Sequence, residues 1–208
     1  LMRNVLADLA LESEAATAFA LRVAGAVDRA ATDPREAAFA RIATAIGKYW
    51  ICKRAPGFAN EAQECLGGAG YVEESGLPRL YRQAPLNSIW EGSGNIQCLD
   101  VLRALAKEPD TGEALLAELL AGSGIDADFD AAFADAQVRF AQGVDEAGAR
   151  AFVERLALLL QAAVLLRAGN PLAAAYCRSR LGDGRGATYG TLASDIDGDA
   201  AIARIFPD

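Results

Sequence analysis

The sequence predicts an all-α protein, an up-and-down helical bundle followed by a helical extension, and three observations support this fold class. Alanine, which has the highest helix propensity, accounts for 46 of the 208 residues. Apolar residues reach 52% although aromatic residues are only 7%, which favours closely packed helices over a sheet. Apolar positions also recur at steps of three and four, as one face of a helix requires.

The first expected helix begins almost at residue 1 and ends near residue 30. Its apolar face is formed by Val5, Leu9, Ala16, Phe19, Val23 and Val27. The stretch Thr32–Glu36 predicts a break and a restart. Asp33 can cap the next helix, Pro34 suits its first position and Glu36 has the spacing of a capping box. The second helix should run to about residue 66, with a kink or a break at Pro56–Gly57.

Shorter elements follow the second helix. We expect a helix over residues 77–84 that Pro85 ends, a loop that carries Trp90 and Glu91, and a helix over residues 96–107. Glu108–Asp110 has the composition of a linker. This predicts a bundle domain of residues 1–107 and a helical C-terminal extension of residues 108–208.

The extension is expected to be helical throughout, apart from its turns. Gly169–Pro171 gives a helix stop, a cap and a new start, and Gly182–Gly190 is a glycine-rich loop. The expected helices lie near residues 110–121, 126–142, 146–168, 171–181 and 191–205.

Composition excludes several functional classes. The chain contains no histidine, which removes histidine-dependent nucleophilic catalysis and histidine-containing zinc sites. The four cysteines have no metal-binding or redox spacing. We expect them to be reduced and mostly buried thiols in a cytoplasmic protein, and we expect no metal site. The longest apolar stretch, Leu156–Leu166, is too short to cross a bilayer, so no membrane association is expected.

The charge distribution argues against a nucleic-acid partner. The net charge is −8, and residues 109–208 carry −7 of it without a single lysine. Affinity for duplex DNA comes largely from lysine and arginine at the phosphates. The one local basic grouping in this segment consists of Arg178, Arg180 and Arg185.

Two glycine-flanked corners interrupt the helical pattern. The first is Glu64–Tyr71, with the sequence ECLGGAGY, and the second is Ile89–Asn95, with the sequence IWEGSGN. Glycine lets a backbone turn sharply and approach a ligand closely, and functional residues are concentrated on such loops. The second corner places a single carboxylate, Glu91, next to small polar residues.

The two corners, the segment Glu73–Arg82 between them and the segment Asn87–Gly92 resemble the C-terminal helical domain of acyl-CoA dehydrogenases. The match looks closest to the alkylation-response (AidB-like) branch, and it covers residues 1–107 more strongly than the remainder. The resemblance implies FAD-dependent α,β-dehydrogenation of an acyl-CoA thioester by a homo-oligomer, a dimer or a tetramer. It also implies a fragment, inactive in isolation, that an N-terminal helical domain and a middle β-domain precede.

By this resemblance Glu91 is the catalytic base, which removes the proton α to the thioester carbonyl. Gly92 would allow the backbone to approach the ligand, with the N–H group of Glu91 as one donor of an oxyanion hole. Trp90 would line the acyl pocket. From the residues alone, Glu91 also fits a solvent-exposed loop acid or a helix N-cap partner, and Trp90 fits an ordinary core residue.

The same resemblance assigns FAD contacts. Ser93 and Asn95 match positions that touch the adenosine-diphosphate part of FAD, and their alternative role is to cap the helix that follows. Gly67, Gly68 and Gly70 resemble a turn that reaches the FAD pyrophosphate of a neighbouring subunit. Without the resemblance, this glycine run indicates a Schellman-type helix end.

Three acids, Glu64, Glu73 and Glu74, lie at or just after the first corner. Glu64 stands where many family members have glutamine, and an acid repels phosphates, so Glu64 is not among the expected FAD contacts. Glu73 and Glu74 fit a glycosidase-like carboxylate pair or, far more commonly, two exposed loop acids. Arg79 and Arg82 lie one helical step apart and can pair with these acids or line a subunit interface.

Two alternatives to a dehydrogenase remain open. One is a non-enzymatic alkylation-response flavoprotein that retains FAD. The other is a helical oligomerisation module whose flavin contacts are vestigial. Reduction of the flavin by acyl-CoA distinguishes the enzyme from the first alternative, and the second predicts no flavin even in the full-length protein.

Overall fold

The computed structural model describes residues 1–206 of the chain. Within this range every regular element is a helix, and the β-type pairing consists of one isolated bridge between Arg185 and Leu192. The all-α prediction is therefore confirmed. No helix among these residues is both long enough and apolar enough to cross a membrane. The elements are α1 (Met2–Arg29), α2 (Pro34–Cys65), α3 (Gly68–Tyr71), η1 (Glu73–Ser75), α4 (Leu77–Gln83), η2 (Ala84–Ser88), α5 (Gly94–Lys107), α6 (Pro109–Leu120), α7 (Ala127–Gln142), α8 (Ala149–Arg167), α9 (Ala173–Arg180) and α10 (Gly198–Ile205).

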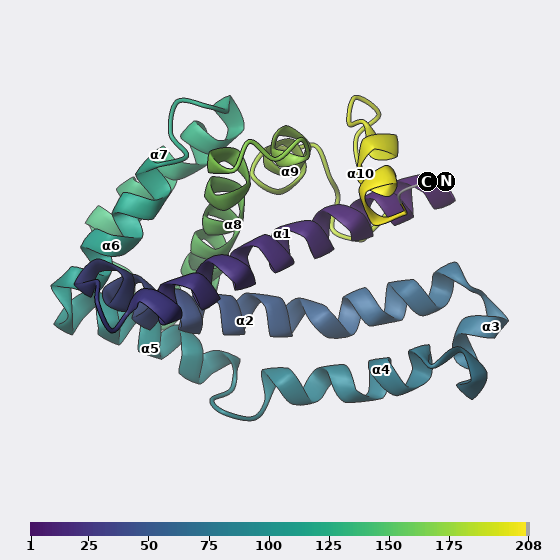
Figure 1. Cartoon of the computed structure of the whole chain (residues 1–208), viewed down its shortest axis with the longest axis horizontal. Helices are drawn as coiled ribbons and strands as arrows, with labels where there is room; N and C mark the ends of the chain where they lie inside the picture. The colour runs from purple at the N-terminus through teal and green to yellow at the C-terminus, as the bar shows by residue number, and fades with distance from the viewer. Residues whose placement is uncertain (207–208) are drawn as a thin grey trace.

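Helices α1 and α2 form a long hairpin that spans the molecule (Figure 1). Asp33 is the N-cap of α2, as predicted, and its Oδ1 accepts hydrogen bonds from the backbone N–H groups of Arg35 and Glu36 at 2.9 and 3.4 Å. The capping-box prediction for Glu36 is wrong. Its carboxylate is held by the guanidinium groups of Arg22 and Arg29, which attract it more strongly than a backbone N–H group.

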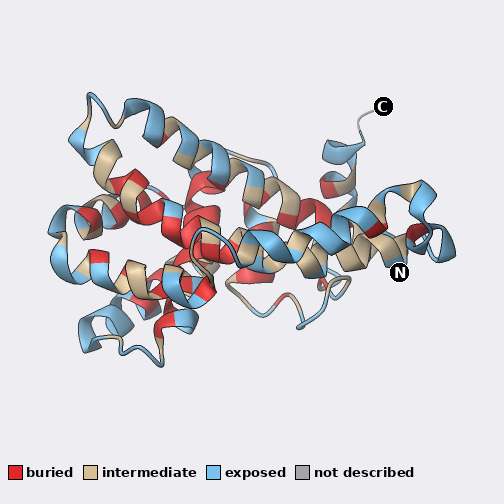
Figure 2. Ribbon diagram, turned by 90° about the horizontal axis from the view of Figure 1, so that it is seen from below, coloured by how far each residue is buried: buried red, intermediate tan, exposed pale blue. Residues whose placement is uncertain are grey.

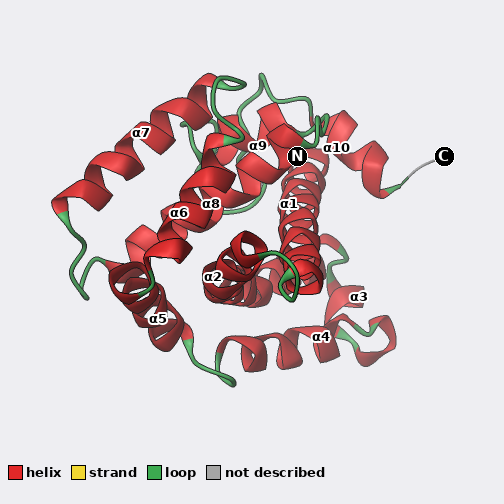
Figure 3. Ribbon diagram, turned by 60° about the vertical axis from the view of Figure 1, so that its left-hand side comes forward, coloured by secondary structure: helices red, strands yellow, loops and turns green. Residues whose placement is uncertain are grey.

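Helix α2 is the central element of the bundle. Figure 3 shows it surrounded by α1, α4, α5, α6 and α8, all of which contact it. The helix runs from Pro34 to Cys65, so the break expected at Pro56–Gly57 does not occur. A proline inside a helix removes one backbone hydrogen bond. Packing against several neighbours outweighs that loss, because tertiary contacts supply most of a helix's stability in a protein.

The apolar core lies at one end of this arrangement, where α5 to α8 pack on the hairpin (Figure 2). The buried residues of α2 all fall between Phe39 and Trp50. Beyond Trp50 no residue of α2 is buried, and α3 and α4 bury only Gly70 and Pro78. Within residues 1–206, the second half of α2 and the α3–α4 segment therefore lack a covering layer, whereas α10 covers the start of α1.

The C-terminal helices complete the core rather than forming one of their own. Phe129 of α7, Leu160 of α8 and Tyr176 of α9 are buried in the same cluster as Phe19 of α1 and Ile46 of α2. A second, smaller cluster attaches α10 and the preceding loop to the start of α1. It consists of Ala7, Ala10, Leu11, Leu172, Leu192 and Ala201.

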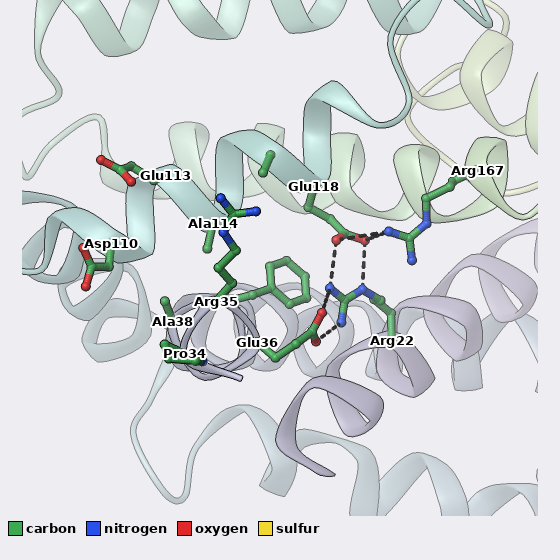
Figure 4. Close-up of a pocket in the computed structure, with 12 residues that line it drawn as sticks. Arg22, Pro34, Arg35, Glu36, Ala38, Asp110, Glu113, Ala114, Glu118 and Arg167 are labelled. Carbon is green, nitrogen blue, oxygen red and sulfur yellow. Dashed lines mark hydrogen bonds and ion pairs between the residues drawn. The ribbon is translucent and has the colours of Figure 1, made fainter. Parts of the chain in front are cut away.

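An ion cluster ties the extension to the hairpin, around a cavity of about 500 Å³ (Figure 4). Glu118 of α6 has a side chain that is only 6% exposed, and it pairs with Arg22 of α1 at 2.9 Å and Arg167 of α8 at 3.3 Å. Arg22 also pairs with Glu36 of α2 at 2.8 Å. Ion pairs thus join four helices, and we infer that this cluster stabilises the packing of the extension on the hairpin.

Several expected boundaries differ from the structure. The linker Glu108–Asp110 is wrong, because α6 begins at Pro109 and Glu108 alone separates it from α5. The last helix begins at Gly198 instead of residue 191. Leu192 is held in the preceding loop by Asn4, whose side chain donates to its carbonyl at 2.9 Å and accepts from its N–H at 3.0 Å.

Candidate active site

The candidate site centres on the segment Asn87–Asn95, called here the Glu91 corner, which runs from the end of η2 into the first turn of α5. The side chain of Lys48 of α2 holds this segment in place. Its Nζ donates to the backbone oxygens of Asn87 at 3.1 Å, Trp90 at 2.6 Å and Gly92 at 3.0 Å. One half-buried ammonium therefore fixes three carbonyl groups of the corner.

The backbone of the corner has an unusual conformation. Glu91 has a φ of 55°, and no other non-glycine residue between positions 1 and 206 has a positive φ. Gly92 follows with a φ of 93°, and a Cβ atom there would lie 2.5 Å from Nε2 of Gln97. This same Nε2 donates to the backbone oxygens of Glu91 and Gly92 at 3.0 and 3.3 Å. Such left-handed non-glycine residues are concentrated at functional sites, where the surrounding structure holds them in place.

The corner also presents unused hydrogen-bond donors. The backbone N–H groups of Glu91, Gly92 and Ser93 have no acceptor among the described residues. Helix α5 begins at Gly94, and the N–H groups of its first turn are free by the geometry of a helix start. Free donors and the positive end of a 14-residue helix together favour a carbonyl or anionic ligand here.

The side chains of the corner are open to solvent in this chain. Glu91 is exposed and has no ion pair or side-chain hydrogen bond with residues 1–206, which agrees with a loop acid and leaves the carboxylate free. Trp90 is 54% exposed, so the core interpretation is wrong. The capping interpretation is also wrong. Ser93 is the N-cap of α5 but its hydroxyl makes no capping bond, and Asn95 is exposed in the first turn.

The other glycine-rich corner, Gly67–Tyr71, ends α2. Gly67 has a φ of 56° and a ψ of −138°, outside the left-handed helical region, so the helix does not end in a Schellman motif. Gly70 is the tightest position, because a Cβ atom there would lie 2.1 Å from the backbone oxygen of Gln63. The side-chain Nε2 of Gln63 donates a hydrogen bond to the carbonyl of Gly70 at 3.1 Å. Gly68 is exposed, with nothing within 4 Å of a Cβ atom.

The two corners do not meet within one chain. They lie at opposite ends of the α4–η2 segment (Figure 1). Lys48 contacts one corner and Gln63 the other, and fifteen residues of α2 span roughly 22 Å at 1.5 Å per residue. A single ligand reaching both corners would therefore have to be long or to bridge two copies of the chain.

A cavity of about 490 Å³ borders the Gly67–Tyr71 corner. Glu73 and Arg82 line it and form an exposed ion pair at 2.8 Å. The hydrogen bond from Arg82 lowers the pKa of Glu73, which keeps this acid ionised. Glu73 and Glu74 are both exposed, as the loop-acid interpretation expects, and Glu64 accepts a hydrogen bond from Asn60 at 2.8 Å.

Sequence reasoning missed Lys48 and Gln97, the two residues that hold the Glu91 corner. Lys48 carried a signal: it is the only charge in the stretch Ile42–Ile51, most of which is buried. A lone lysine in such a stretch requires backbone or side-chain acceptors nearby. Gln97 carried no comparable signal, because a polar residue three positions into a helix is ordinary.

The basic grouping of the extension is not a surface patch. Arg180 is buried against Asp8 at 2.6 Å, and Arg185 lies 3.4 Å from the same carboxylate. Arg178 pairs with Asp183 and Asp195. Among the cysteines, Cys98 and Cys177 are buried and the other two are half-buried. Residues 1–206 contain no cluster of three or more potential metal ligands.

A family model described as "Acyl-CoA dehydrogenase, C-terminal domain" matches residues 1–106 of this chain. The putative acyl-CoA dehydrogenase AidB of Escherichia coli (strain K12) is 46% identical over 203 residues, which cover 97% of this chain and 37% of AidB. The chain thus spans well under half the length of this relative.

Two solved structures share the fold. Bd2924 in its apo form matches with a TM-score of 0.66 and 27% identity, over 77% of this chain and 32% of that chain. ACDH-11 of Caenorhabditis elegans, in complex with C11-CoA, matches with a TM-score of 0.64 and 21% identity, over 95% of this chain and 38% of that chain.

Proposed function

Because the chain belongs to the acyl-CoA dehydrogenase family, we propose that it forms the C-terminal part of an FAD-dependent enzyme that oxidises an acyl-CoA thioester between Cα and Cβ. The observation that carries the proposal is the Glu91 corner. It combines a free carboxylate, a left-handed backbone and unused N–H groups, and Lys48 and Gln97 hold it in place.

Glu91 acts as the general base in this proposal. Its carboxylate removes the proton from Cα, and the N–H group of Glu91 donates to the thioester oxygen as negative charge develops there. When bound, FAD would supply the acceptor for the hydride that leaves Cβ, and the product would be an enoyl-CoA. The carboxylate is exposed in this chain, so the neighbouring parts of the full-length protein must exclude water from it.

The residues at both corners fit a phosphate-bearing cofactor. Ser93 and Asn95 are unpaired polar side chains at the start of α5, where free N–H groups and the helix dipole favour an anion. Gly67, Gly68 and Gly70 form the second corner, which is too far away to touch the same part of the cofactor from the same chain. We therefore assign this glycine corner to the FAD of a neighbouring copy.

Self-association follows from the same proposal. Large apolar side chains are exposed between the end of α2 and the start of α5, namely Leu66, Tyr71, Val72, Leu80, Leu86, Ile89, Trp90 and Ile96. A group of large exposed apolar side chains is typical of an interface. We expect the chain to form at least a dimer, and a strict monomer in sedimentation at tens of micromolar would contradict this.

The decisive test replaces the base in the full-length protein. Glu91→Gln keeps the shape of the side chain and removes its basicity, so it should lower the dehydrogenation rate by roughly 10²–10⁴-fold while FAD stays bound. Glu74→Gln is the matched control, because Glu74 is also exposed and lies outside the corner. Unchanged turnover with Glu91→Gln would refute Glu91 as the base.

A non-enzymatic flavoprotein is the second candidate, and the exposure of Glu91 favours it. Among residues 1–206, no side chain shields this carboxylate from water, as proton removal from carbon requires. The two candidates differ in one measurement on full-length protein, the reduction of bound flavin by a panel of acyl-CoA thioesters under anaerobic conditions. Reduction by any of them supports the enzyme, and bound flavin that none of them reduces supports the second candidate.

A further inference from the structure

We propose that Lys48 is a positioning residue that strengthens the backbone hydrogen-bond donor of the Glu91 corner toward a thioester oxygen. The inference rests on the proposed function, in which the N–H group of Glu91 donates to that oxygen. Its basis is the order of the hydrogen bonds along the corner. Side chains occupy the carbonyl groups of three successive peptide units, and the N–H groups of the same units are unpaired among the described residues.

The first of these peptide units joins Trp90 to Glu91, and the other two follow it along the chain. Nζ of Lys48 donates to the carbonyl of the first unit at 2.6 Å, and Nε2 of Gln97 donates to the carbonyl of the second at 3.0 Å. The third carbonyl accepts from both side chains, at 3.0 and 3.3 Å. All peptide units of residues 1–206 are trans, and a trans unit directs its N–H group opposite to its carbonyl. The three N–H groups therefore point away from the side chains that hold the corner.

The ammonium group of Lys48 acts through the backbone alone. It has three N–H bonds, and three carbonyls of the corner accept them at distances between 2.6 and 3.1 Å. Within the described chain the ion pairs of α2 are made by Glu36, Arg41 and Arg54, so no carboxylate neutralises Lys48. The ammonium has no donor left for a ligand, and its full charge bears on the peptide units of the corner.

The bond from Lys48 to the carbonyl of Trp90 affects the N–H group of Glu91 directly, because the two groups belong to one peptide unit. Hydrogen bonds linked in this way polarise one another and strengthen each other by roughly 10–30% per bond. Bonds from an ionised donor are stronger than neutral ones. The donor that the proposed function assigns to the thioester oxygen is thus the one next to the shortest bond of Lys48.

A purely structural role for Lys48 makes a different prediction. Lys48 and Gln97 both hold the corner, so the loss of either side chain would misplace the N–H groups to a similar degree. Polarisation by charge distinguishes the two, because the Gln97 amide is neutral and bonds the carbonyls of Glu91 and Gly92 instead of that of Trp90. A comparison of variants at the two positions therefore separates the effect of charge from the effect of shape.

Isotope-edited infrared spectroscopy of the full-length protein tests the inference without turnover. The probes are butanoyl-, octanoyl- and dodecanoyl-CoA that carry two methyl groups on Cα and an isotope label at the carbonyl carbon. They have no proton at Cα to lose, so they can be bound at saturation without reacting. A hydrogen bond to the thioester oxygen lowers its C=O stretching frequency. Lys48→Met should lose roughly a third of the wild-type shift, and Gln97→Met, the matched control, should lose less than half as much.

The outcomes separate this inference from the proposed function. Equal losses in the two variants, or an unchanged shift in Lys48→Met, would overturn the inference and leave the proposed function intact. A wild-type protein that binds none of the probes, or binds them without a shift, would refute the proposed function and the inference together.

The rate of flavin reduction by an acyl-CoA substrate gives a second readout. Lys48→Met should lower this rate about tenfold with little change in KM, because the donor is weakened but not removed. Loss of a whole oxyanion-hole donor costs roughly 10²–10³-fold. Circular dichroism checks that each variant is folded, and Lys48→Gln, which keeps amide donors without the charge, takes the place of Lys48→Met if that variant unfolds.

Discussion

At the scale of single residues, Lys48 explains why the Glu91 corner has a defined shape. A corner with consecutive positive φ values is intrinsically unfavourable, and something outside it must hold it. The ammonium of Lys48 bonds three carbonyls across the corner from the middle of α2. Charged hydrogen bonds of this kind are worth more than neutral ones, so one side chain connects the core of the bundle to the candidate active site.

Replacing Lys48 should therefore loosen the corner. Lys48→Met keeps the aliphatic stem and removes the charge, which should cost about 1–3 kcal/mol of the free energy of unfolding. Urea unfolding measures this cost, and limited proteolysis should show faster cleavage within residues 87–92. Lys53→Met, an exposed position on the same helix, serves as the control. Equal protease resistance in the two variants would contradict the assigned role of Lys48.

At the scale of elements, the end of α2 depends on one close approach of two backbones. The chain turns back at Gly67 and α3 packs so that Gly70 lies against the last turn of α2. The backbone oxygen of Gln63 occupies the space that a side chain at position 70 would need. The glycine pattern of this corner thus has a structural cause at position 70, whereas Gly68 has free space and no such requirement.

Alanine substitutions separate these two glycines. Gly70→Ala must displace α3 from the end of α2 and should destabilise the chain by about 1–3 kcal/mol, as overpacking usually does. Gly68→Ala should change the free energy of unfolding by less than about 0.5 kcal/mol. Chemical denaturation of both variants checks the prediction. Similar costs at the two positions would show that the 2.1 Å approach is not what fixes this corner.

At the scale of the whole molecule, ion pairs join parts of the chain that are distant in sequence. Glu118 connects α6 to α1 and α8, and Asp8 connects the start of α1 to α9 and the loop beyond it. Each acid is nearly inaccessible to solvent. Removing one partner of such a cluster leaves the other charges buried and unpaired, which costs far more than the loss of a surface pair.

Glu118→Ala should consequently destabilise the chain by about 3–5 kcal/mol. Glu113 lies on the same helix but is exposed and without an ion pair among residues 1–206, so Glu113→Ala should change stability by less than about 0.5 kcal/mol. Thermal and urea unfolding of the two variants provide the comparison. A loss below 1 kcal/mol for Glu118→Ala would mean that the extension is held by apolar contacts alone.

The same pairs make stability depend on pH. Burial raises the pKa values of Glu12 and Glu36, but their arginine partners outweigh it, and both pKa values lie below the ordinary 4.5. The unfolded chain therefore binds protons at these carboxyls at a higher pH than the folded chain does. Their contribution to stability is complete above about pH 4.5 and is lost as the pH falls through the lowered values, by up to about 1.4 kcal/mol per pH unit for each group.

Urea unfolding between pH 7 and pH 3 measures this dependence. Glu36→Gln should flatten the acid limb, because one of the linked carboxyls is gone. A curve that keeps its slope in this variant would assign the acid sensitivity to other groups.

Features that depend on neighbouring residues could be predicted from the sequence alone. Alanine content and three- and four-residue spacing were enough for the all-α class, and Asp33 with Pro34 was enough for the start of α2. The glycines around Glu91 indicated a sharp corner for the same local reason. Helix propensity, capping and turn chemistry act over a few residues, so their effects can be predicted from the local sequence.

The partners of the charged residues, in contrast, depend on how distant segments pack. Glu36 bonds arginines instead of its own cap, Arg180 is buried against Asp8, and Lys48 reaches the Glu91 corner, all through contacts between segments far apart in sequence. Packing also keeps α2 helical past Pro56, and Trp90 lies exposed on the surface. The energy of a charge or of a helix interruption depends on how much solvent and which groups surround it, and the fold sets those surroundings.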